Sequence, residues 1–162
     1  MITYTELVGS HVPRETERVS GIPGQLFLQI ARALKVVLAA DGEVNGAELN
    51  VYLDTCRRFG APNSMLDELR DFDPTCTTLE ECFGALDADS IPARSLLYDA
   101  IRIAKADGSY DRSERAAVTR AAELLGLEDE WVEKITALVD AEEALTNLRV
   151  ALLLPPGLHA FR

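Results

Sequence analysis

Apolar residues recur three and four positions apart along most of the chain, and the periodic stretches stop near glycine or proline. The first stretch, Gln25 to Ala40, is polar after its first residue only at Gln29, Arg32 and Lys35. Its large apolar residues are Leu26, Phe27, Ile30, Leu34, Val37 and Leu38. This pattern predicts a central helix that the rest of the protein covers on most sides.

The same spacing predicts six further helices. They span Asn45 to Gly60, Pro62 to Phe72, a short segment through Cys82, Phe83 and Leu86, Ala93 to Ala106, Asp111 to Gly126, and Asp129 to Leu154. The last helix carries its main apolar residues at Trp131, Ile135, Leu138, Leu145 and Leu148. No stretch alternates polar and apolar residues for long enough to form a sheet. The expected fold class is all-α, with about seven helices in two pseudo-symmetric halves.

Two turns between predicted helices have matching sequences, 66 residues apart. The first contains Asp41, Gly42, Asn45 and Glu48, and the second contains Asp107, Gly108, Asp111 and Glu114, with no gap in the alignment. The match continues into the flanking helices, where the apolar positions repeat at the same offset. A common offset for polar and apolar positions indicates an internally duplicated helical unit.

Helix capping explains most of each turn. Asn45 and Asp111 stand three residues before a glutamate, which is the spacing of a capping box, and the glycine of each turn suits the end of a helix. Capping does not explain Asp41 and Asp107, because a carboxylate in the last turn of a helix faces the negative end of the helix dipole. That placement costs about 0.3–1 kcal/mol at a surface, so we expect a compensating interaction.

A bound cation would provide such compensation. If the two halves pack about a pseudo-twofold axis, the turns lie side by side and bring together Asp41, Glu48, Asp107 and Glu114. Carboxylate oxygens favour Ca²⁺, Mg²⁺ or Mn²⁺ over Zn²⁺. The turns are not EF-hands, because glycine follows the aspartate directly and the glutamate comes seven residues after it. From the residues alone, a cation site and a purely structural turn both remain open.

Charge and composition exclude several classes of function. The chain of 162 residues has 27 acidic and 16 basic residues, and its formal charge of −11 repels phosphate backbones and anionic lipid headgroups. We therefore expect no nucleic-acid binding, and the lack of a long apolar run predicts no membrane insertion. Three cysteines without CxxC spacing, and an N-terminus without a signal sequence, favour the reducing cytoplasm. We expect two of them, Cys56 and Cys82, to serve in packing.

At the two turns the sequence resembles the tellurite-resistance TerB family, to which the N-terminal domain of the membrane DnaJ-like proteins is related. The resemblance rests on two Ala-Asp-Gly-x-x-Asn/Asp-x-x-Glu turns in an acidic all-α chain and covers roughly Gln25 to Leu154. It implies a seven-helix bundle with internal duplication, whose two turns form an acidic cluster that binds a divalent cation. The expected metal ligands are Asp41, Glu48, Asp107 and Glu114, followed by Asn45 and Asp111. An asparagine at position 45, where an acidic residue or serine is usual, lowers the charge of the first half-site.

The resemblance also implies a function. Family members act in tellurite, phage and chemical-stress resistance as metal-responsive adaptors to membrane-associated protein partners, and no catalytic reaction is established for them. We therefore expect a divalent-cation-binding stress-response adaptor, monomeric or homodimeric, and not an enzyme. Two alternatives stay open, a structural protein-interaction module without metal and a hydrolase-type enzyme that uses the carboxylates. The only histidines, His11 and His159, lie in the end segments, which disfavours a buried Ser-His-Asp relay.

The ends of the chain are expected to lie outside the helical domain. Residues 1–24 predict a loosely packed arm, residues 25–154 the helical domain, and residues 155–162 a tail. The run Ala151 to Leu154 is more apolar than one buried helix face usually absorbs, so part of it should be covered. The candidates are a second copy of the protein, the tail from Leu158 to Phe161, or the arm, through Leu7, Val12 or Ile22. We favour the arm, because it leads directly into the first helix.

Overall fold

The computed structural model describes residues 24–42, 44–84, 93–106, 108 and 110–153, apart from the side chain of Asp41. This part is helical throughout and contains no strand. Its elements are α2 (Gly24–Leu38), η2 (Ala39–Asp41), α3 (Gly46–Arg58), α4 (Asn63–Asp71), η3 (Pro74–Cys76), α5 (Leu79–Gly84), α6 (Ala93–Ala104), α7 (Arg112–Leu124) and α8 (Asp129–Leu153). The predicted all-α class and its seven α-helices are confirmed, whereas the arm and the tail lie outside the described residues.

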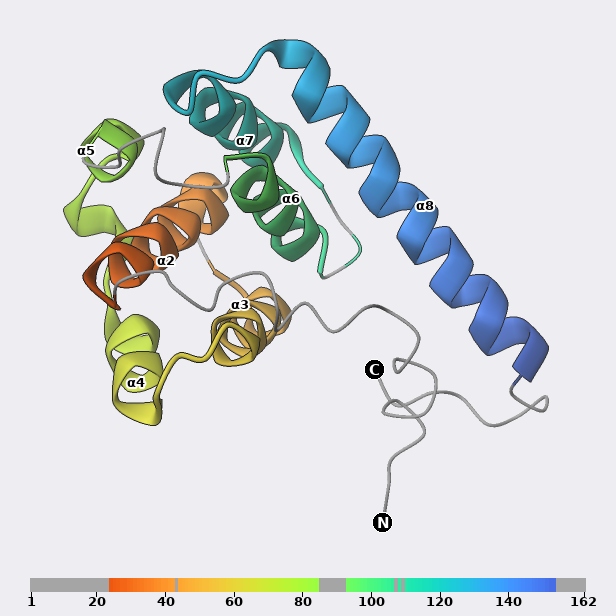
Figure 1. Ribbon diagram of the computed structural model, residues 1–162, viewed down its shortest axis with the longest axis horizontal. Coiled ribbons are helices and arrows are strands. Elements are labelled where there is room, and N and C mark those ends of the chain that lie inside the picture. Colours follow the sequence, from red (N-terminus) through yellow and green to blue (C-terminus); the bar gives the residue numbers. More distant parts are fainter. Residues whose placement is uncertain (1–23, 43, 85–92, 107, 109, 154–162) are drawn as a thin grey trace.

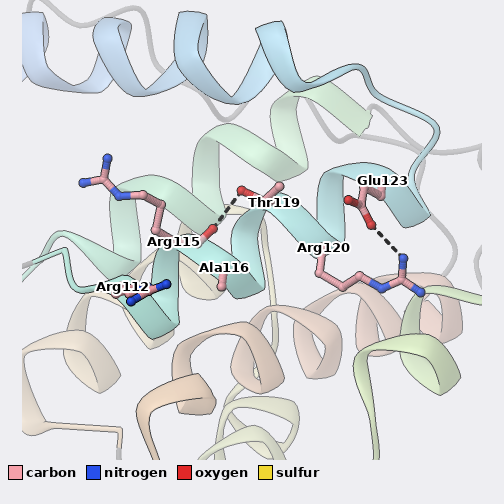
Figure 2. Close-up of a pocket in the computed structure, with 6 residues that line it drawn as sticks. All are labelled: Arg112, Arg115, Ala116, Thr119, Arg120 and Glu123. Carbon is pink, nitrogen blue, oxygen red and sulfur yellow. Dashed lines mark hydrogen bonds and ion pairs between the residues drawn. The ribbon is translucent and has the colours of Figure 1, made fainter.

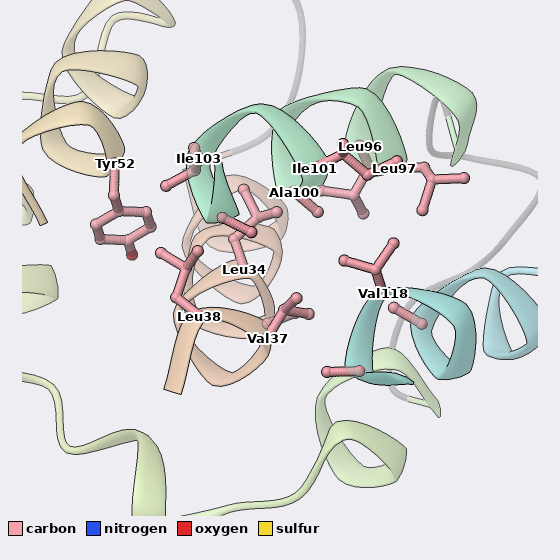
Figure 3. Close-up of a cluster of buried hydrophobic side chains, with 14 of the residues drawn as sticks. Leu34, Val37, Leu38, Tyr52, Leu96, Leu97, Ala100, Ile101, Ile103 and Val118 are labelled. Atoms are coloured by element: carbon pink, nitrogen blue, oxygen red, sulfur yellow. The ribbon is translucent and has the colours of Figure 1, made fainter. Parts of the chain in front are cut away.

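Helix α2 is the central element of the fold. It contacts α3, α4, α5, α6 and α7, which surround it in Figure 1. Four of its residues are almost inaccessible to solvent, namely Ala31, Ala33, Val37 and Leu38. Figure 3 shows Leu34, Val37 and Leu38 of α2 facing side chains of α6 and α7 across the hydrophobic core. The prediction of a covered central helix is therefore confirmed.

The two halves share their helix boundaries as well as their sequence pattern. Helices α3 and α7 begin and end 66 residues apart, and α2 and α6 end 66 residues apart. Shortly after α2 and α6 the chain passes through a glycine with positive φ, which is 105° at Gly42 and 87° at Gly108. A β-carbon is strained in this conformation, which explains glycine at both positions. The halves also interlock, since η2 packs against α7 and α3 packs against α6. A duplicated origin for them stays a prediction.

A buried lysine joins α2 to the end of α4. The side chain of Lys35 is 5% exposed, and its Nζ donates hydrogen bonds to the carbonyls of Leu69, Arg70 and Phe72 at 2.8, 2.7 and 2.7 Å. The last carbonyls of a helix have no partner within the helix, so one ammonium group satisfies three acceptors at once. Burial lowers the pKa of Lys35, while Asp71 and Asp73 act in the opposite direction.

Polar contacts also connect α3 to α6 and to α2. Arg102 Nη2 donates to Thr55 Oγ1 at 2.7 Å and lies 3.5 Å from the buried carboxylate of Asp99. The Tyr52 hydroxyl donates to the carbonyl of Ala31 at 2.8 Å. These partners allow polar side chains to be buried inside the bundle.

Helix α8 has a buried apolar face and a second apolar face that is exposed. It packs on α6 and α7 through Val132, Ile135 and Val139, which are buried. Leu138, Leu145 and Leu148 do not belong to this contact, because they are about half exposed or more. The apolar run from Ala151 is exposed at residues 151–153, and the arm and the tail, two of its expected covers, lie outside the described residues. Within the described residues no helix is long and apolar enough to cross a membrane.

Replacing Lys35 with methionine should lower the free energy of unfolding by at least about 2 kcal/mol, because each buried carbonyl left without a donor costs about 1–3 kcal/mol. Methionine keeps the apolar stem, so the loss reports mainly on the ammonium group. Urea denaturation of both proteins measures the difference. Lys134→Met is the matched control, since Lys134 pairs with Glu130 at an exposed site and should lose less than about 1 kcal/mol. Equal losses in the two variants would contradict this role.

The cysteines should differ strongly in reactivity. Burial raises the pKa of the Cys56 thiol to about 12, whereas Cys76 is exposed. Because the thiolate is the reactive form, iodoacetamide near neutral pH should alkylate Cys76 in the native protein and reach Cys56 only after unfolding. Peptide mass spectrometry with and without denaturant measures this. Comparable labelling of both residues in the native protein would show that the α3 core opens readily.

Candidate functional site

The first of the two repeated turns is built as a capping box. Asn45 Oδ1 accepts hydrogen bonds from the backbone N–H groups of Ala47 and Glu48 at 2.9 and 3.1 Å. Glu48 Oε2 accepts in return from the backbone N–H of Asn45 at 3.0 Å. The two side chains thus satisfy donors at the start of α3 that have no partner within the helix.

The second turn repeats this arrangement. Asp111 Oδ1 accepts from the backbone N–H of Glu114 at 2.8 Å, and Glu114 Oε2 accepts from the backbone N–H of Asp111 at 2.7 Å. Both glutamates are buried, with Glu48 3% and Glu114 2% exposed. A carboxylate in the first turn of a helix lies at the positive end of the helix dipole, which stabilises its charge. The capping interpretation of these four residues is therefore confirmed.

The remaining predicted ligands are the two aspartates. Asp41 is the last residue of η2, and η2 packs against α7, the helix that follows the second turn. The side chain of Asp41 and the whole of Asp107 lie outside the described residues. Among the side chains that the structure does describe, no three His, Cys, Asp or Glu residues are grouped to hold a metal ion. Glu48 and Glu114 therefore do not form a metal site with the other described side chains.

The surroundings of the two turns are not equivalent. Beside the second turn, the guanidinium of Arg115 lies 4.8 Å from the ring centre of Tyr110, and Lys105 Nζ lies 5.9 Å from it. Lys105 also forms an ion pair with Asp140 of α8. The matching positions in the first half are Ala39, Val44 and Leu49. Of these matching positions, only those of the second half carry basic side chains, and its cap is an aspartate where the first turn has an asparagine.

An arginine-lined groove runs along the outer face of α7, and sequence reasoning did not identify it. Figure 2 shows the side chains that line its volume of about 380 Å³, which are Arg112, Arg115, Ala116, Thr119, Arg120 and Glu123. Arg120 is already held by ion pairs with Glu80 at 2.9 Å and Glu123 at 2.7 Å. The sequence signal for it was three arginines within nine residues, at positions 112, 115 and 120, in an otherwise acidic chain.

Comparison with known proteins agrees with this fold. Residues 30–137 match the family described as tellurite resistance protein TerB. A tellurite resistance protein from Nostoc punctiforme PCC 73102, known from a crystal structure, superposes with a TM-score of 0.73 and is 25% identical in sequence. The superposition covers 96% of this chain and 97% of the other. No curated protein matches the chain by sequence. Since the matched residues include both capped turns and most of the bundle, the chain belongs to the TerB family.

Proposed function

We propose that this TerB-family protein is a divalent-cation-binding adaptor that connects a protein partner to a stress response. The packing of η2 against α7 carries this proposal, because it brings the helix end that bears Asp41 to the helix that starts at the second turn. The end of the chain segment that bears Asp41 and the helix that follows the second turn therefore lie side by side. A cation between them would offset the repulsion of the carboxylates of the two turns.

The structure separates the predicted ligands into two groups. Asn45, Glu48, Asp111 and Glu114 each have an oxygen occupied by a backbone N–H, so their first role is to fix the turns. Asp41 and Asp107 are then the main ligands, because the helices that follow are capped by Asn45 and Asp111. A carboxylate has two oxygens and about four acceptor positions, so a glutamate in a capping box can also coordinate an ion. An all-oxygen set of this kind suits Ca²⁺, Mg²⁺ or Mn²⁺.

Charge and family support the same proposal. A formal charge of −11 attracts cations and basic surfaces and disfavours nucleic acid. The Nostoc relative is described as a tellurite resistance protein, which suggests resistance to tellurite or related chemical stress for this chain too. We place the protein in the cytoplasm, where a reducing environment suits the free thiols of Cys56, Cys76 and Cys82. The partner, membrane-associated or not, would recognise the ion-bound protein.

A structural interaction module without metal is the second candidate, and the two capping boxes favour it. They account for four of the six predicted site residues by hydrogen bonds alone. On this interpretation the turns serve only to reverse the chain between helices. The hydrolase alternative gains no support from the groove on α7, because arginine is its most frequent lining residue.

Substitution of the aspartates should separate the first two candidates. Asp41→Ala and Asp107→Ala should each weaken binding of Ca²⁺, Mg²⁺ or Mn²⁺ by about tenfold or more, which corresponds to about 1.4 kcal/mol. The helical circular dichroism signal should remain, because Asn45 and Asp111 are the N-caps of the helices that follow. Isothermal titration calorimetry of the full chain measures the affinities. Asp67→Ala, which removes a carboxylate paired with Arg70 on the surface of α4, is the control. Unchanged ion binding in the Asp41/Asp107 double variant would reject the cation site.

Substitution of the caps should affect stability. Asn45→Ala and Asp111→Ala should each lower the free energy of unfolding by about 0.5–2 kcal/mol, because they leave helix N–H groups without acceptors. Chemical denaturation in the presence of a chelator measures this loss without any contribution from bound ions. Glu143→Ala, an exposed change in the middle of α8, should stay within about 0.5 kcal/mol of the unmodified chain. A cap variant as stable as this control would contradict the capping role.

A further inference from the structure

The distal half of α8 carries an exposed apolar stripe that the bundle does not use. The apolar contact with the bundle runs through Val132, Ile135 and Val139, and polar contacts to α6 and to the residue directly after it follow at Glu142 and Asp140. Beyond Val139, residues 140–148 and 151–153 are all exposed. Figure 1 shows α8 continuing past α6, so that its last turns extend away from the other helices. The part after residue 142 is 11 residues long, or about 16 Å of helix.

The exposed apolar residues follow a heptad repeat. Leu138, Leu145 and Leu152 are spaced by seven, and Ala141 and Leu148 fall between them at intervals of three and four. This is the a and d pattern of a coiled coil, with leucine at every a position described. The four leucines are 50%, 47%, 54% and 73% exposed in chain order. We call these five residues the α8 seam.

The seam is separate from the rest of the fold. The seam is rotated around the helix axis by about 100°, the angle between successive residues, from the stripe that packs on α6 and α7. The two apolar faces of α8 therefore point in different directions. The match to the TerB family ends at residue 137, directly before the seam starts at Leu138. The exposed seam is therefore not needed to complete the bundle.

The charged residues beside the seam indicate what it binds. In heptad terms, Glu142 and Arg149 both occupy e positions, and Ala144 and Ala151 occupy the g positions. In an antiparallel pair of identical helices, e positions of one helix lie near e positions of the other, so Glu142 of each copy lies near Arg149 of its partner. A parallel pair would place both charges beside alanine. The small g residues also allow close approach of the two backbones.

We propose that the α8 seam binds the seam of a second copy of this chain, as a short antiparallel coiled coil with twofold symmetry. The twofold axis makes the interface self-complementary, since each Glu142 and each Arg149 finds an opposite charge. Antiparallel pairing also places the two bundles at opposite ends of the shared helix pair, which limits repulsion between two strongly acidic molecules. The proposal does not rest on cation binding at the turns.

Sedimentation equilibrium of the full chain over a range of concentrations tests the proposal. We expect a reversible dimer of the 17.7 kDa chain. Leu145→Glu and Leu148→Glu should each give a monomer at every concentration, with unchanged helical circular dichroism because both positions are exposed. A full chain that is monomeric at every concentration overturns the proposal. This includes the cases in which the chain's own end segments cover the seam or in which the seam binds another protein. A dimer that survives both substitutions also overturns it.

Charge exchange tests the antiparallel orientation. Glu142→Arg or Arg149→Glu alone should weaken the dimer several-fold, because the twofold axis changes two contacts at once. The double exchange should restore the affinity. Glu142 also accepts a hydrogen bond from Tyr98 at 2.5 Å within one chain, so Tyr98→Phe reports the loss of that contact alone. Glu143→Arg, on the opposite side of α8, should leave the dimer intact. Failure of the double exchange to restore the dimer, with Glu143→Arg unaffected, overturns the antiparallel arrangement.

Discussion

The burial of α2 is the constraint on which the other helices depend. A helix that is apolar around most of its circumference can be stable in water only if neighbours cover it on all those sides. Five other helices do so, and they come from both halves of the chain. Several polar atoms at this centre have partners, namely the three carbonyls bound by Lys35 and the hydroxyl of Tyr52. Apolar burial and hydrogen bonds to buried polar atoms thus both stabilise the centre of the bundle.

The two turns follow from the same constraint. Each must end one helix and start the next within a few residues, so that both helices can reach the core. Glycine with positive φ ends the first helix, and a reciprocal pair of side-chain hydrogen bonds starts the second. These requirements fix most of the repeated motif. They do not explain the aspartate before each glycine, and there we propose the cation site.

Much of the fold could be predicted from the sequence, because the signals were local. Helical spacing gave the seven helices, and glycine or proline gave most of their ends. The capping boxes followed from the three-residue spacing of Asn45 with Glu48. The partner faces of α8 could not be predicted in this way. The sequence pattern does not separate the apolar residues at 135 and 139 from those at 138 and 145. Only the positions of α6 and α7 show that they belong to two different faces of the helix. The contact of Lys35 with α4 likewise depends on helices that are brought together only by the fold.

The crosswise packing of the two halves sets this bundle apart from repeat proteins that grow by stacking. In a solenoid each unit contacts only its neighbours in sequence, so units can be added or removed with gradual changes in stability. Here η2 of the first half packs on α7 of the second, and α3 packs on α6, so each half completes the hydrophobic core of the other. Neither half therefore has a complete core of its own among the described residues. A chain split between α5 and α6 should yield fragments that fold only together.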